Sequence, residues 1–80
     1  MLQVLVEISF YPLSDSYEVD ILEFIKRLRS YDGIEVEPGQ TSTVIRGDFD
    51  LVWAILETEC KIALGRGSKS ALVIKILNTA

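Results

Sequence analysis

Hydrophobic and polar residues alternate strictly over residues 3–11. Val4, Val6, Ile8 and Phe10 fall on one side of an extended chain, and Leu5, Glu7, Ser9 and Tyr11 fall on the other. This period of two is typical of a β-strand with one buried face. The strand is predicted to end at Pro12, because proline cannot donate a hydrogen bond to a neighbouring strand.

Two later segments repeat their apolar residues at helical spacing. The first stripe is Tyr17, Ile21, Phe24, Ile25 and Leu28, and the second is Val52, Ile55, Leu56, Ile62 and Ala63, widened by Leu51 and Trp53. The segment Ser14-Asp15-Ser16 is predicted to supply the N-cap of the first helix, with Glu18 three residues after Asp15 as in a capping box. Asp32-Gly33 predicts the end of this helix. Asp48 is predicted to cap the second helix, which runs to about Leu64.

Three further strands are predicted at residues 34–37, 41–47 and 70–77, with a turn at Pro38-Gly39 between the first two. The resulting order is βαββαβ within one domain, residues 1–80. Helical crossovers between strands of one sheet are right-handed, so both helices should cover the same face. The predicted fold class is therefore α+β, a ferredoxin-like sandwich with a four-stranded antiparallel sheet and two helices on one face.

The other face of this sheet has no predicted cover. Alternation assigns to it Leu5, Glu7, Ser9, Tyr11, Ser42, Val44, Arg46, Ala71, Val73, Lys75 and Leu77. Such a surface is too apolar for open water, and exposed apolar patches usually mark a partner or ligand surface. We expect a homodimer or tetramer through this sheet face.

Composition narrows the classes of function. The net charge is −4 and the eight Lys and Arg residues are scattered, so no nucleic-acid partner is expected. No basic segment precedes the first apolar run, and no uncharged stretch approaches the roughly 20 residues needed to span a bilayer. These features predict a cytoplasmic protein without membrane insertion.

The chain has few groups for catalysis. It has no histidine, which excludes histidine-based triads and histidine metal sites, and it has no calcium-type Asp-rich loop. Cys60 is the only cysteine and is interpreted as a small buried apolar residue rather than a reactive thiol. We expect no metal, no cofactor and no enzymatic activity.

Two segments resemble a known family. Val6-Glu7-Ile8-Ser9-Phe10-Tyr11-Pro12-Leu13 and Gly39-Gln40-Thr41-Ser42-Thr43-Val44-Ile45-Arg46-Gly47-Asp48 are similar to the thiamine-binding proteins of the YkoF and MTH1187 type. The resemblance implies a ferredoxin-like fold that forms dimers or dimers of dimers. Some members of that family bind thiamine or its hydroxymethylpyrimidine half without catalysing anything, and others have no established ligand. Ser42 and Thr43 fall on the family's "[ST]-T" positions, whereas Ser14-Asp15 and Arg46 depart from its usual residues.

Binding an aminopyrimidine requires an aromatic face and short polar groups aimed at the ring edge. The candidate ligand-binding residues are Glu7, Ser9, Tyr11, Thr41, Ser42 and Thr43. Ordinary structural interpretations stay open beside this one. Threonine favours strands by propensity alone, Tyr11 could pack against a partner subunit, and Glu7 could pair with Lys75 or Arg46 across the sheet.

Trp53 is interpreted as an interface or core residue, and Arg66 as part of a solvated turn. The function that this sequence favours is non-enzymatic binding of thiamine or hydroxymethylpyrimidine, in vitamin B1 transport, salvage or sensing. Two alternatives stay open. One is a regulatory or assembly module resembling ACT domains, and the other is a structural oligomer without a small ligand.

Overall fold

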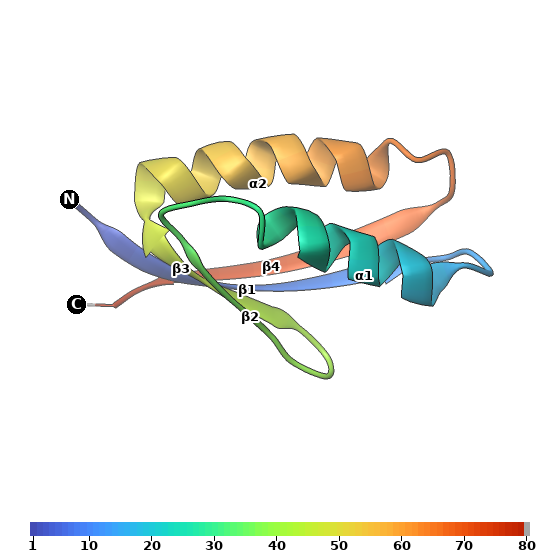
Figure 1. The fold of residues 1–80 in the computed structure, drawn as a ribbon, viewed down its shortest axis with the longest axis horizontal. Coiled ribbons are helices and arrows are strands. Elements are labelled where there is room, and N and C mark those ends of the chain that lie inside the picture. Colours follow the sequence, from blue (N-terminus) through green and yellow to red (C-terminus); the bar gives the residue numbers. More distant parts are fainter. Residues whose placement is uncertain (80) are drawn as a thin grey trace.

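A computed structural model describes residues 1–79 of the chain. Its elements are β1 (Gln3–Pro12), α1 (Tyr17–Leu28), β2 (Glu35–Pro38), β3 (Thr43–Asp48), α2 (Phe49–Leu64) and β4 (Ser70–Asn78). Both helices lie on the same side of the sheet, and the start of β1 lies beside the end of β4 (Figure 1). The predicted α+β ferredoxin-like fold, with the order βαββαβ, is confirmed.

The sheet places β1 at its centre. The strand order is β2-β3-β1-β4, and every neighbouring pair is antiparallel. Glu7 of β1 therefore lies between Val44 of β3 and Lys75 of β4. The adjacency of β1 and β3, on which the predicted binding site depends, is confirmed.

The buried face of β1 carries the core. Its four helix-facing residues are at most 8% exposed, as the alternation predicts, and they pack with side chains from both helices and β3. The buried apolar residues are Val4, Val6, Ile8, Phe10, Phe24, Leu28, Ile45, Val52, Ile55, Leu56 and Ala63. Leu28 is 0% exposed and lies at the end of α1. The core therefore joins both helices to the two central strands.

The start of α1 follows the prediction in part. Ser16, one of the three predicted N-cap residues, is the N-cap, but it makes no side-chain capping bond, and the capping box of Asp15 and Glu18 does not form. Instead, the hydroxyls of Ser14 and Ser16 donate to the Asp20 carboxylate at 2.9 and 3.3 Å. A carboxylate one turn into the helix attracts both hydroxyls more strongly than a neutral backbone group does. The cap of α2 follows the prediction, because Asp48 accepts from the Leu51 amide at 3.3 Å.

Arg66 lies in an exposed turn, as the sequence suggested, and it also makes two ion pairs there. Its guanidinium lies 2.8 Å from Glu23 and 3.5 Å from Asp20, and its side chain is 29% exposed. The loop before β4 therefore folds back onto α1, because two carboxylates one turn apart attract this cation.

The strand predicted at residues 41–47 begins later, at Thr43. The Gly39 amide donates to the Ser42 carbonyl at 2.8 Å and closes a turn between β2 and β3. Thr41 and Ser42 consequently belong to the hairpin loop. Two of the three predicted hydroxyl residues therefore lie before the strand, where the alternation of a strand does not decide which face they occupy.

Candidate ligand-binding site

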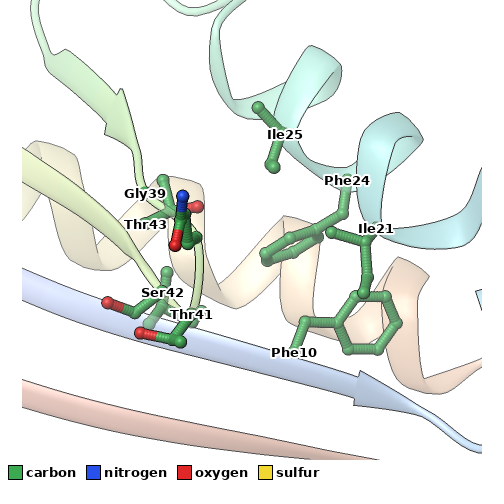
Figure 2. Close-up of a pocket in the computed structure, with 10 residues that line it drawn as sticks. Phe10, Ile21, Phe24, Ile25, Gly39, Thr41, Ser42 and Thr43 are labelled. Atoms are coloured by element: carbon green, nitrogen blue, oxygen red, sulfur yellow. The ribbon is translucent and has the colours of Figure 1, made fainter. Parts of the chain in front are cut away.

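A small hollow lies between α1, β1 and the loop that joins β2 to β3. We call it the hairpin hollow; its lining residues are Ile8, Phe10, Ile21, Phe24, Ile25, Gly39, Gln40, Thr41, Ser42 and Thr43. Its volume is about 70 Å³. Figure 2 shows the side chains of α1 on one side and the loop on the other. The hollow therefore has one apolar wall and one polar wall.

The apolar wall contains two aromatic rings. The centroids of Phe10 and Phe24 are 5.1 Å apart, and the ring planes are inclined by 50°. This tilted arrangement is favourable for aromatic pairs, and both residues are buried. The pair gives the hollow a rigid aromatic surface.

The polar wall is the hairpin turn. A Cβ atom on Gly39 would lie 2.9 Å from the Ser42 carbonyl oxygen, so the tight turn requires glycine at this position. The turn brings the backbone of residues 39–43 alongside the aromatic wall (Figure 2). Main-chain groups and short hydroxyl side chains therefore border the hollow.

The three predicted loop residues Thr41, Ser42 and Thr43 meet at this hollow. Thr43 is 5% exposed and lies beside Ile8 in the sheet register. In Figure 2 the Thr41 and Ser42 hydroxyls point away from the Phe10 and Phe24 rings. A ligand at the rings would reach these two hydroxyls only after rotation of their side chains.

Ser9 adjoins the loop from the other side of the sheet. Its hydroxyl donates to the Thr41 carbonyl at 3.2 Å, across 32 residues of sequence. This bond ties the hairpin loop to β1. The prediction that two hydroxyl-bearing segments far apart in the chain meet is therefore confirmed for Ser9 and Thr41.

Glu7 and Tyr11 lie with Ser9 on the uncovered side of the sheet, which we call the open face. The Glu7 carboxylate is 3.5 Å from the Lys75 ammonium, so the predicted cross-strand pair is present. Tyr11 is 51% exposed beside Ala71. The six candidate residues thus divide between the open face and the hairpin hollow, and a ligand role for each stays a prediction.

The open face is apolar around that central ion pair. Val73 and Leu77 of β4 are 52% and 51% exposed, and Leu5 of β1 lies beside Leu77. Arg46 pairs with Glu37 at 3.3 Å toward the β2 edge. The predicted mixture of apolar and polar groups on this face is present.

The sequence analysis did not identify Glu59 as a structural residue. This residue of α2 is 1% exposed, although it is charged. Arg27 donates to one of its carboxylate oxygens at 2.7 Å, and the Tyr31 hydroxyl donates to the other at 2.6 Å. A buried carboxylate needs such partners, and here they link α2 to the end of α1. Its position i+4 from Ile55 on the apolar stripe was the available signal.

The hydrogen bond from Tyr31 predicts a distinct alkaline titration. Hydrogen bonding to Glu59, then burial and the negative charge of Glu59, raise the Tyr31 pKa above 10.0. The neutral phenol therefore contributes stability that is fully present below pH 10 and is lost as the pH rises through the higher folded-state pKa. In a titration followed by tyrosinate absorbance, Tyr31→Phe should remove the last step. The control Tyr17→Phe, at an exposed tyrosine, should retain that step, and its loss there would contradict the assignment.

Groups with reactive chemistry are few. Burial, followed by the charge of Glu59, raises the pKa of the half-buried Cys60 thiol and disfavours the thiolate. In the part of the chain that the structure describes, no three Cys, Asp or Glu side chains are grouped to hold a metal ion. Within those same residues, no helix has the length and apolar character to cross a membrane.

Comparison with known proteins identifies relatives by fold. No protein-family model and no curated protein matches the chain. Hypothetical protein MJ1052 from Methanocaldococcus jannascii superposes with a TM-score of 0.83 at 24% identity, over 100% of this chain and 84% of that one. SP2199 from Streptococcus pneumoniae gives 0.86 at 19% identity, over 95% and 86%.

A third solved structure has a name that indicates a function. TM0486 from Thermotoga maritima, a "putative thiamine biosynthesis/salvage protein", gives a TM-score of 0.82 at 20% identity, over 92% of this chain and 81% of that one. Identities this low establish the common fold alone. The chain thus shares its ferredoxin-like fold with these three proteins along most of their length.

Proposed function

We propose that this chain is a non-enzymatic binding protein for thiamine or its hydroxymethylpyrimidine half, acting in vitamin B1 transport, salvage or sensing. The observation that carries the proposal is the hairpin hollow, where the Phe10 and Phe24 rings face the Thr41–Thr43 segment. The fold shared with TM0486, whose name refers to thiamine biosynthesis or salvage, supports the same ligand class. The absence of histidine from the sequence supports binding without catalysis.

The chemistry of the hollow suits a flat heteroaromatic ring. The ring would pack against Phe24 and Phe10, and its edge would meet Thr43 and the main-chain groups of residues 41–43, with the Thr41 and Ser42 hydroxyls reaching it only after their side chains rotate. The net charge of −4 also favours a cationic ligand such as thiamine over an anionic one. The proposal therefore places the pyrimidine edge at the hairpin loop.

Size restricts which part of the vitamin enters. The hollow measures about 70 Å³, whereas sites for drug-sized ligands occupy roughly 300–1,000 Å³. We therefore assign the hollow to the pyrimidine half, with the thiazolium outside it. Exposed Gln40, in the loop, is the lining residue that can move aside for entry.

Calorimetric titration with hydroxymethylpyrimidine and with thiamine tests the function. Both should release or absorb heat on binding, and Thr43→Val should weaken binding about tenfold, which corresponds to one lost hydrogen bond of about 1.4 kcal/mol. Thr58→Val, at an exposed threonine of α2, is the matched control and should bind as the wild type does. No heat and no thermal shift with either compound would exclude the function.

The same titration distinguishes the two candidate surfaces. If the ligand lies on the open face, Glu7→Gln and Tyr11→Phe should weaken binding and Thr43→Val should not.

In the proposed assembly, a homodimer or tetramer forms through the open face. Its exposed Tyr11, Val73 and Leu77 support that assembly.

A further inference from the structure

A groove lies on the helix side of the sheet, between α2 and the outer strand β4. We call it the α2–β4 groove; it holds about 400 Å³, and its lining residues are Trp53, Leu56, Glu57, Cys60 and Ile74. The first four recur at spacings of one to four residues along α2 and share one face of that helix, whereas Ile74 comes from β4. The volume falls within the roughly 300–1,000 Å³ that is typical of sites for small molecules.

The groove exists because the helices do not cover the outer strand. Strand β4 pairs with β1 alone, at the edge of the sheet. Its helix-facing residues Ile74 and Ile76 are 41% and 42% exposed, whereas the helix-facing residues of β1 are at most 8% exposed. An apolar wall therefore stays in contact with water on the helix side, and a ligand in the groove would remove it from water.

Trp53 is the largest side chain along the groove. It is 54% exposed, which excludes a place in the core. Its ring stacks on Phe49, with centroids 5.9 Å apart and planes 3° from parallel. The stack holds the indole in place before any ligand arrives, so little side-chain freedom is lost on binding.

The charge along the groove has one sign. Among the described residues that line it, Glu57 alone is formally charged. Burial, followed by the charge of Glu59, raises the pKa of the Cys60 thiol, which therefore adds no second charge. Glu57 and Trp53 are four residues apart on α2, and both a carboxylate and the face of an indole attract a cation. The net charge of −4 acts in the same direction.

The present partner of Glu57 is easily replaced. Its carboxylate lies 3.3 Å from the Lys61 ammonium, and the two side chains are 62% and 76% exposed. Exposed pairs of this kind are weak, because water and salt screen both charges. A cation that also gains apolar contacts in the groove would therefore displace Lys61 from Glu57.

We propose that the α2–β4 groove is a second binding site, which takes a small organic cation with a quaternary or tertiary ammonium group on an apolar ring or chain. The apolar part would pack against Leu56 and Ile74, and the ammonium group would lie by Trp53 and Glu57. This site shares no lining residue with the hairpin hollow. It also lies on the face opposite to the open face, so the proposed assembly leaves it accessible.

Calorimetric titration of the full chain with benzyltrimethylammonium tests the site. Benzyl alcohol is the neutral comparison and phenylacetate the anionic one. The cation should bind about tenfold more tightly than either, and its affinity should fall as salt is added. The emission of Trp53, the single tryptophan, should shift to the blue as the cation replaces water beside the ring.

Two variants of α2 should change the affinity in opposite directions. Glu57→Gln keeps the shape of the side chain and should weaken binding of benzyltrimethylammonium about fivefold. Lys61→Met removes the competing ammonium group and should strengthen binding about twofold, a gain that loss of structure would not produce. Glu18→Gln, the same change at an exposed position of α1, is the matched control and should bind as the wild type does.

Three results would overturn the proposal: no binding of benzyltrimethylammonium, equal binding of all three probes, or binding without a change in Trp53 emission. Thr43→Val should leave this binding unchanged, and hydroxymethylpyrimidine should not compete with it, because the hairpin hollow is a separate site. Loss of pyrimidine binding alone would therefore reject only the function proposed above. Thiamine is not used as the probe, because it is itself a cation and would not distinguish the two sites.

Discussion

Leu28→Ala is expected to lower the free energy of unfolding by about 2–5 kcal/mol. Leu28 is 0% exposed at the end of α1 and belongs to the core that joins both helices to the sheet. Truncation removes buried methyl groups and leaves a cavity that a tightly packed interior fills only partly. Small domains are stable by about 5–15 kcal/mol, so this loss is a large fraction of the total.

Thermal and urea unfolding measure the effect. The midpoint should fall by roughly 10–30 °C for a domain of this size. Leu22→Ala is the matched control, because it makes the same change on the same helix at a side chain that is 66% exposed. Its stability should stay within about 0.5 kcal/mol of the wild type. Equal losses in the two variants would contradict the burial that the structure assigns to Leu28.

Glu59→Ala is expected to cost about 2–4 kcal/mol. The change removes the acceptor of the 2.7 Å bond from Arg27 and the 2.6 Å bond from Tyr31. The Arg27 side chain is 43% exposed and can regain water, which limits the loss. The Tyr31 hydroxyl loses its charged acceptor, and the space left by the side chain opens between the helices.

Glu57→Ala provides the comparison on the same helix. Glu57 is 62% exposed and pairs with Lys61 at 3.3 Å, and an exposed pair of this kind contributes little to stability. Urea unfolding should show Glu57→Ala within about 0.5 kcal/mol of the wild type. A Glu59→Ala variant as stable as Glu57→Ala would show that the buried cluster does not hold the helices together.

The fold could be predicted because its signals are local. The alternation from Val4 to Phe10 and the helical spacing through Leu28 each depend on side chains a few residues apart. Asp48 caps α2 by the same kind of short-range bond. The capping box at Asp15 could not be judged this way, because the Ser14 hydroxyl donates to Asp20 and the distant Arg66 pairs with the same carboxylate.

The candidate site could be predicted only in part. Placing β1 beside β3 follows from the order of elements, and it brings Ser9 to Thr41 as expected. The aromatic wall of the hollow was not foreseen, because Phe10 and Phe24 read as core residues. The face on which Ser42 lies also depended on where the hairpin turn closes, which is a matter of backbone geometry rather than of alternation.

The sequence by itself determined the element order, the buried face of β1 and the amphipathic character of the open face, because periodicity acts between near neighbours. Only the tertiary structure decided that Glu59 is buried beside Arg27 and Tyr31, that the helices leave β4 uncovered, and that a hollow forms at the hairpin. Those features depend on how far each helix extends across the sheet. That distance is set by the packing of side chains from distant segments, so local sequence patterns do not predict it.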